Sequence, residues 1–330
     1  MRGKEISVII PIYNAEAKIE YCVRKLLCNN CDFEIILVDD GSKDLSLNVC
    51  SQLEEDFKDK VTVIHKENGG VSSARNVGLK YAQGEIITFS DVDDYFCEHA
   101  LDKIVLKMKS EQLDLLVWNY QVETDKENYS CSMWFDDNKQ YWTPQDIKKE
   151  YWLFVKNGVV NPVWNKAFNG TIIRNNRIEF NEKITFSEDA LFNIDFLKVS
   201  NRIGHLDSVL YHYLINEESA THREHLDYYE MLNYVFGQVE AFLGKDNIAI
   251  QSQWYYEEWL NVINQTIYHQ KYKLLNKEMI QNSMRTKNMI KFYHPINLKQ
   301  KIQIFFIKVH CLHIYGYLKK WKITIKNLRQ

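Results

Sequence analysis

Short apolar runs alternate with segments of helical spacing through the first half of the chain, and this alternation constrains the fold most strongly. Apolar runs typical of strands buried on both faces occur at 6–10, 34–38, 61–65, 85–90 and 113–120. Apolar positions at helical spacing lie between and after them, at 16–27, 44–57, 72–83 and 98–110. Strands that alternate with helices through short connections predict an α/β fold with a doubly wound, mostly parallel sheet.

The remaining chain is less regular and then becomes helical. Residues 123–186 are rich in Trp, Tyr and Asn, and we interpret them as loops, short strands and one helix at 145–156. A helix at 188–199 and a strand at 208–214 follow, and from about 224 onward the pattern is helical. The 330 residues therefore predict two parts, an α/β domain at 1–220 and a helical C-terminal region at 221–330.

Charge is distributed very unevenly along the chain. The net charge is only −3, but no acidic residue follows Glu278, whereas eleven basic residues do. The end of the chain, 297–330, mixes large apolar residues with lysines, and Lys308 and two histidines interrupt its apolar runs. This composition favours a basic amphipathic helix at an anionic membrane surface over a membrane span, and the alternative is a surface helix packed on the body.

Two further features bear on the compartment. The apolar run at the N-terminus reaches Tyr13 and Asn14 after about eight residues, which is too short for a signal peptide or a membrane span. Seven cysteines are irregularly spaced, and the Cys28–Cys31 pair has no second pair at zinc-site spacing, so free thiols are expected. We expect a cytoplasmic protein that meets the inner face of the plasma membrane through its tail.

Three polar clusters follow predicted strands, at the edge of the sheet where ligands bind in doubly wound folds. They are PIYN at 11–14, DDGS at 39–42 and DVDD at 91–94. No glycine-rich phosphate-binding motif follows the first strand, which removes the main support for a dinucleotide-binding or P-loop fold. Each cluster alone is a common turn or acidic loop, and the indication of a site comes from their order and shared placement.

A nucleoside diphosphate explains all three clusters. Asp39 or Asp40 can accept the N3–H of uracil, and Tyr13 can stack on the ring. Asp91 and Asp93 would repel a pyrophosphate unless a divalent cation lay between them. A basic side chain at the start of the 72–83 helix, Arg75, can favour phosphate, and the glycines at 69–70 permit close approach of the backbone.

The sequence resembles the family-2 glycosyltransferases of the GT-A fold over about residues 5–215. The stretches that carry the resemblance are SVIIPIYNAE (7–16), FEIILVDDGSKD (33–44), ENGGVSSARNVGL (67–79), GEIITFSDVDD (84–94), VWNKAF (163–168) and FSEDALFN (186–193). The resemblance implies inverting transfer of a sugar from a UDP-sugar to a hydroxyl of a glycan or lipid-linked acceptor, with Mn²⁺ or Mg²⁺. It also implies a nucleotide-binding half at 1–120, an acceptor-side half at 121–220, and a role in bacterial exopolysaccharide, capsule or cell-surface glycan assembly.

The resemblance also assigns roles to individual residues. Asp189 would be the general base and Glu188 would orient the base or the acceptor, although both could instead be first-turn carboxylates that complement a helix dipole. Asp93 would hold the metal and Asp91 would contact the ribose or the metal. His212 would be a third ligand and His222 a weaker candidate, although packed histidines are the alternative. The implied donor-binding residues are Pro11, Tyr13, Asn14, Glu16, Asp39, Asp40, Gly41, Asn68, Gly70, Arg75, Asp91, Val92, Trp164 and Lys166.

Other functions fit the residues less well. A nucleotidyltransferase would need a glycine-rich basic loop where this chain has PIYNAE. A non-catalytic, lectin-like or scaffold protein would not need to keep Asp39, Asp91, Asp93 and Asp189. The acidic body argues against a nucleic-acid partner. Whether the chain forms a homo-oligomer is left open by the sequence.

Overall fold

The computed structural model describes most of the α/β region and parts of the helical region. The described residues are 3–124, 127–132, 139, 141–156, 160–215, 228–250, 256–257, 259–260, 286–288, 291, 294–295 and 297–308. They fall into two units, Met1–Arg223 and Glu224–Gln330, and each unit is considered by itself.

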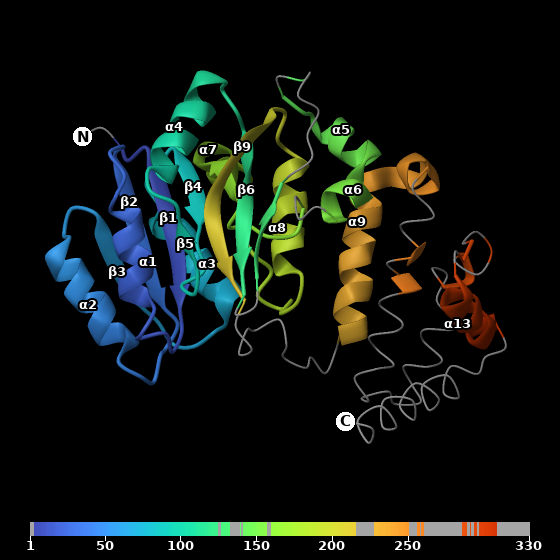
Figure 1. Cartoon of the computed structure of the whole chain (residues 1–330), viewed down its shortest axis with the longest axis horizontal. Coiled ribbons are helices and arrows are strands. Elements are labelled where there is room, and N and C mark those ends of the chain that lie inside the picture. The colour runs from blue at the N-terminus through green and yellow to red at the C-terminus, as the bar shows by residue number, and fades with distance from the viewer. Residues whose placement is uncertain are drawn as a thin grey trace. The chain divides into compact units, whose positions relative to one another are not determined.

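Parallel strands form one half of the sheet in the first unit, in the order β3-β2-β1-β4 (Figure 1). Their bounds are β1 (Ile6–Ile12), β2 (Phe33–Asp39), β3 (Val61–His65) and β4 (Ile86–Phe89). Every residue of β2 is buried, as expected for a strand covered on both faces. The predicted strand–helix alternation is confirmed in this half.

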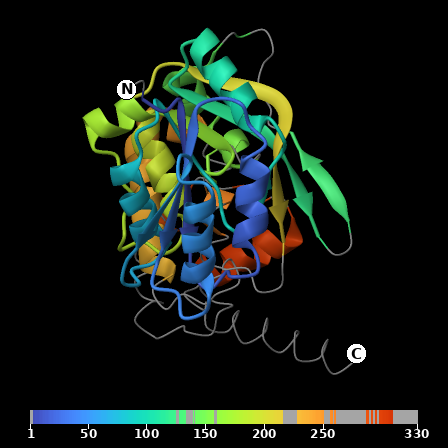
Figure 2. The same ribbon diagram turned by 90° about the vertical axis from the view of Figure 1, so that its left-hand side faces the viewer.

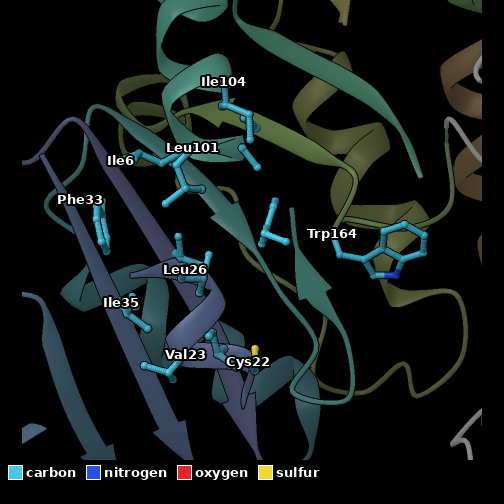
Figure 3. Packing of buried hydrophobic residues seen from close by; sticks show 14 of the residues in the cluster. Ile6, Cys22, Val23, Leu26, Phe33, Ile35, Leu101, Ile104 and Trp164 are labelled. Atoms are coloured by element: carbon cyan, nitrogen blue, oxygen red, sulfur yellow. The ribbon is translucent and has the colours of Figure 1, made fainter. Parts of the chain in front are cut away.

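Helices cover both faces of the parallel strands, as Figure 2 shows from the β3 end of the sheet. They are α1 (Ile19–Leu26), α2 (Ser46–Asp56), α3 (Val71–Tyr81) and α4 (Ala100–Ser110). One core cluster joins alternate residues of β1 and β2 to α1, α2 and α4, and Figure 3 shows Ile6, Val23, Phe33 and Leu101 from it. On the other face α3 packs so closely that a β-carbon at Gly78 would lie 2.3 Å from the side chain of Ile9.

The second half of the sheet is mixed. Strand β8 (Lys166–Asn169) lies antiparallel between β4 and β6 (Leu115–Glu123), and β9 (Ile203–Leu214) runs parallel to β6. The short strands β5 (Tyr95–Phe96) and β7 (Asn128–Cys131) pair antiparallel with β9 and β6. The sheet is therefore mostly parallel, which confirms the expected fold class.

Several elements differ from the sequence-based expectation. The helix expected at 145–156 is two helices, α5 (Pro144–Lys149) and α6 (Tyr151–Lys156), because Glu150 leaves the helical conformation between them. The loop expected around Trp164 leads at once into β8, and the helix α7 (Gly170–Asn176) follows. The helix α8 (Glu188–Leu197) lies where a helix was predicted.

The second unit is helical where it is described. It contains α9 (Tyr228–Ile250), which is interrupted at Gly244 by a non-helical backbone (φ 74°), and α13 (Leu298–Lys308). Trp259 is fully buried, and its Nε1 donates a hydrogen bond to Thr286 Oγ1 at 3.1 Å. Most of the helix predicted at 253–270, and the tail beyond Lys308, lie outside the described residues.

Membrane-spanning helices are not found among the described residues: none of these helices combines the necessary length with sufficient apolar character.

Candidate active site

The carboxylate of Asp40 fixes the loop after β2 to the loop between β3 and α3. Its Oδ1 accepts hydrogen bonds from Lys66 Nζ (2.5 Å) and the backbone N–H of Gly69 (2.9 Å), and its Oδ2 accepts from the N–H of Gly70 (2.8 Å). Asn68 Nδ2 donates to the backbone oxygen of Asp40 at 2.8 Å. Both carboxylate oxygens of this buried residue are therefore engaged in holding the loop that begins α3.

Asp39 has a different environment, although it is equally buried. Its Oδ2 lies 2.6 Å from Nδ1 of His65, the residue beside it in the β2–β3 register. Its Oδ1 receives the backbone N–H of Ser42 at the longer distance of 3.4 Å. Of the two aspartates that the sequence left open as acceptors for a base, Asp39 is the one with an oxygen that is only weakly engaged.

The loop after β1 is tied to the DDGS turn by its own polar residues. Asn14, which has a positive φ of 48°, accepts the N–H of Lys43 at 2.8 Å, and Glu16 accepts the N–H of Leu45 at 2.8 Å. Both were predicted to contact a donor, and the structure uses their side chains to position the turn. Tyr13 directly precedes Asn14 and has 42% of its surface exposed, so its ring remains available for stacking.

Glycine is required at Gly41 in this loop. Its φ is +70°, and a β-carbon there would lie 2.8 Å from the backbone nitrogen of Asn68. The predicted residues Gly41, Asn68 and Gly70 thus form one connected turn region next to Asp39 and Asp40. Pro11 lies just before it, paired with Val38 across β1 and β2.

The DVDD loop after β4 places its acids in contrasting surroundings. Asp91 and Asp93 are partly exposed, at 36% and 41% of their side chains, and each meets one cation: Arg75 Nη2 lies 2.9 Å from Asp91 Oδ1, and Lys18 Nζ lies 3.0 Å from Asp93 Oδ1. Val92 between them is half-buried against the core. Asp91 and Asp93 are therefore the carboxylates of this loop that solvent or a ligand can reach.

Asp94 anchors the same loop, and sequence reasoning missed this role. It is buried, accepts a hydrogen bond from the hydroxyl of Tyr211 at 3.0 Å and another from the N–H of Leu214 at 2.9 Å. The hydroxyl of Tyr211 in turn accepts the N–H of Asp91 at 3.0 Å. Burial, with the nearby charge of Asp91, raises the pKa of Asp94 to about 8.

Arg75 connects the DVDD loop to the start of α8. Its guanidinium is buried, with Nη1 2.7 Å from Asp189 Oδ1 and 3.6 Å from Glu188 Oε1, and with Nη2 on Asp91. Both terminal nitrogens of Arg75 lie on carboxylates, and a contact between Arg75 and a phosphate stays a prediction. Two acids separated by 98 positions in sequence, Asp91 and Asp189, are brought to one cation.

The acids at the start of α8 follow a strained residue. Ser187, which precedes the helix, has a positive φ of 63°, a conformation that costs energy outside glycine and that recurs at functional sites. Burial raises the pKa of Asp189 to about 7, although Arg75 beside it lowers it. A carboxylate with a pKa near neutrality is suited to accept a proton from a reacting group.

Trp164 and Lys166 are packed inside the unit. The Trp164 indole stacks on the rings of Tyr211 and Tyr213, at 4.8 and 5.3 Å between centroids, and Figure 3 shows it at the edge of the core. Lys166 is buried and donates to the carbonyl of Pro162 and to Asn165 Oδ1, and burial lowers its pKa to about 7. Both side chains are therefore held by contacts within the protein, and their contact with a donor stays a prediction.

His212 does not join the aspartates of the DVDD loop. It stacks on Tyr95 with ring centroids 4.5 Å apart, and its Nδ1 lies 2.6 Å from Glu123 Oε1. Side chains alternate along β9, so the residue after Tyr211, which faces Asp94, points to the opposite face. In the part of the chain that the structure describes, no three His, Cys, Asp or Glu residues converge as metal ligands, and His222 lies outside that part.

Comparison with known proteins decides the family. Residues 7–168 match the model of glycosyl transferase family 2. The chain belongs to this family through those residues. In Bacillus subtilis (strain 168), the uncharacterized glycosyltransferase EpsJ is 32% identical over 221 residues, which are 66% of this chain and 62% of EpsJ.

Solved structures share the fold, which is GT-A. The Staphylococcus aureus protein TarS (residues 1–349), crystallised with UDP-GlcNAc, has a TM-score of 0.68 at 20% identity, over 97% of this chain and 92% of that one. The mannosyltransferase PcManGT from Pyrobaculum calidifontis, in complex with GDP-Man and Mn²⁺, has a TM-score of 0.54 at 16% identity, over 94% and 88%. The family and the GT-A fold inferred from the sequence motifs are confirmed.

Replacement of Arg75 should destabilise this glycosyltransferase domain. Arg75→Leu leaves three carboxylates without their cation. We expect the free energy of unfolding, measured with urea, to fall by about 2–3 kcal/mol. This loss is smaller than the usual cost of breaking a buried ion pair, because solvent screens the partly exposed Asp91. Arg75→Lys should lose less stability, because it retains the positive charge. It should still be less stable than the native protein, because one ammonium group cannot replace a guanidinium that contacts carboxylates through both terminal nitrogens. Equal stability of Arg75→Leu and the native protein would contradict this role.

Proposed function

We propose that the chain is an inverting, metal-dependent glycosyltransferase that transfers a hexosyl or N-acetylhexosaminyl group from a UDP-sugar to a hydroxyl of a glycan or lipid-linked acceptor. The observation that carries the proposal is the bridge of Arg75 between Asp91 and Asp189. It puts a carboxylate of the donor-side loop and a candidate base within reach of one side chain. Binding of UDP-GlcNAc by TarS supports the choice of donor.

The donor base would bind at the ends of β1 and β2. Tyr13 offers an exposed ring for stacking, and Asp39 offers a carboxylate oxygen to the N3–H of uracil. Asn14, Glu16, Asp40 and Asn68 would act indirectly, since their side chains hold the surrounding turns. This arrangement leaves the pyrophosphate to extend toward the DVDD loop.

A divalent metal fits the residues of that loop. Asp91 and Asp93 provide oxygen ligands at partly exposed positions, and Mg²⁺ in particular is commonly held by one or two carboxylates together with substrate phosphates and water. A third protein ligand is therefore not required, which agrees with the position of His212 on Glu123. When bound, the ion would neutralise the charge that develops on the departing diphosphate.

Asp189 would remove the proton from the acceptor hydroxyl. Inversion needs one base, because the acceptor oxygen attacks the anomeric carbon on the side opposite the diphosphate. Arg75 holds the Asp189 carboxylate at 2.7 Å and so fixes its orientation, while Glu188, 3.6 Å from the same nitrogen, completes the negative surroundings of the guanidinium. Residues 121–220 would form the acceptor side.

The acceptor would be met at the cytoplasmic face of the plasma membrane. On α13, Leu298, Ile302 and Phe305 are exposed at helical spacing, and Lys299, Lys301 and Lys308 are exposed on the same helix. An apolar stripe flanked by lysines suits insertion at an anionic leaflet, where each lysine adds about 1 kcal/mol of attraction. A role in exopolysaccharide, capsule or cell-surface glycan assembly would follow, and a homo-oligomer remains compatible with it.

Metal dependence can be tested with a panel of UDP-sugars. UDP release should require Mn²⁺ or Mg²⁺, stop with chelator, and fall at least about 100-fold in Asp93→Asn, because an amide is a much weaker ligand for a hard cation than a carboxylate. Asp56→Asn, an exposed change on α2, is the matched control and should retain the native rate. Metal-dependent release at the native rate by Asp93→Asn would remove the metal assignment.

The assignment of the base predicts a separation of rate from binding. Asp189→Asn should lower kcat by about 100-fold or more, the usual contribution of general base catalysis, while calorimetric affinity for UDP stays within about threefold of native. Asp195→Asn makes the same change on an exposed position of α8 and should have no effect. If kcat is unchanged in Asp189→Asn, another group accepts the proton.

Membrane contact can be measured by co-sedimentation with vesicles. The full chain should sediment with vesicles rich in phosphatidylglycerol more than with phosphatidylcholine alone, and high salt should weaken binding. A variant with Leu298→Ser, Ile302→Ser and Phe305→Ser removes exposed apolar groups only, so it should fold and yet lose binding. Equal sedimentation of this variant and the native chain would show that α13 is not the contact.

A further inference from the structure

His65 was not among the residues that the sequence motifs indicated, yet its contact with Asp39 is among the shortest polar contacts in the site. The two lie side by side in the register of β2 and β3, and Nδ1 of His65 is 2.6 Å from Asp39 Oδ2. The side chain of Asp39 is fully buried, whereas 52% of the His65 side chain is exposed. The histidine therefore covers the carboxylate at the edge of the sheet.

The contact with His65 leaves the two oxygens of Asp39 with different hydrogen-bond partners. Oδ2 is occupied by the histidine, and among the described residues the one donor to Oδ1 is the N–H of Ser42 at 3.4 Å, long for a strong hydrogen bond. The neighbouring Asp40 is engaged more strongly, because Lys66 and Gly69 donate to one of its oxygens and Gly70 donates to the other at 2.8 Å. Among these four carboxylate oxygens, Asp39 Oδ1 is thus the one whose hydrogen bond is weakest.

Nucleobases differ in how many donors they present to such an acceptor. Uracil presents a single donor, N3–H, between two carbonyl groups. Guanine presents N1–H and the amino group at C2 side by side, a pair that matches both oxygens of one carboxylate. Cytosine has an acceptor at N3, which a carboxylate repels. A site with one available oxygen therefore suits uracil best.

We propose that His65 determines the choice of nucleobase by occupying one oxygen of Asp39, so that the remaining oxygen selects uracil over guanine. His65 acts through Asp39 and is a positioning residue. This inference rests on the proposed use of a nucleoside diphosphate sugar. It extends the proposed function by naming the contact that excludes a guanine nucleotide. Guanine-nucleotide donors occur with this fold, since PcManGT was crystallised with GDP-Man.

The test compares calorimetric binding of UDP and GDP, with Mn²⁺ present, to the native chain and to two variants. His65→Phe retains a ring and removes both nitrogens, so UDP binding should weaken and the ratio of UDP to GDP affinity should fall by roughly tenfold, the value of about one hydrogen bond. His65→Asn retains a donor near the position of Nδ1 and should keep the ratio within about threefold of native. Thermal unfolding identifies a variant that does not fold, and His65→Ala then replaces His65→Phe.

A double-mutant cycle separates action through Asp39 from a direct contact with the base. In an Asp39→Asn background, His65→Phe should change the UDP-to-GDP ratio no further, because the oxygen that it positions has been altered. An unchanged ratio in His65→Phe, with native UDP binding intact, overturns the role of His65 and leaves the proposed function standing. Absence of UDP binding by the native chain overturns the proposed function and this inference together.

Discussion

A buried guanidinium surrounded by carboxylates is the interaction on which the arrangement of the site depends. Arg75 enters from α3, Asp91 from the end of β4, and Asp189 from the start of α8. Asp91 is 16 positions from Arg75 in sequence, whereas Asp189 is 114 positions away. Each of the three carries a charge whose burial would be costly alone. Because the cation and the acids compensate each other, these ion pairs join the edge of the parallel sheet to the start of α8.

The loops around this centre are fixed by the protein's own hydrogen bonds before any ligand is considered. Asp40 gathers three donors from the loop that begins α3, and Tyr211 links the backbone of Asp91 to the carboxylate of Asp94. A site whose polar groups are already oriented does not spend binding energy on ordering them. Of the five non-glycine residues with positive φ among the described residues, two belong to the candidate site: Asn14 in the loop after β1 and Ser187 just before α8.

The sequence predicted the parts of this structure that local pattern controls. Apolar runs located β1 to β4, and the polar residues that follow them indicated a candidate site, because parallel strands end at one edge. The pattern did not reveal β8, whose antiparallel insertion between β4 and β6 depends on tertiary pairing. The sequence was therefore sufficient to predict the fold class. The strand pairing in the mixed half of the sheet could be seen only in the structure.

The sequence predicted which residues lie at the candidate site better than it predicted which residues they contact. Arg75 was recognised, but its contact with Asp189 crosses 114 positions, and no local feature indicates such a contact. His212 was placed with the metal, although the alternation of β9 directs Tyr211 and not its neighbour toward the DVDD loop. His65 could have been found from the sequence, since parallel pairing of β2 with β3 puts it beside Asp39 once the register is known.

In two pairs of adjacent aspartates of the candidate site, Asp39–Asp40 and Asp93–Asp94, the two members have different environments. Asp40 and Asp94 are buried with their oxygens satisfied by neighbours, whereas Asp39 and Asp93 keep an oxygen that is weakly engaged or exposed. A flexible loop could not hold a carboxylate where a base or a cation needs it, because ordering that loop would cost about 1–2 kcal/mol for each residue's backbone. A second carboxylate that binds the loop's own donors lowers that cost. In each pair, one aspartate therefore holds the loop, and the other keeps an oxygen that the loop's own donors engage less fully.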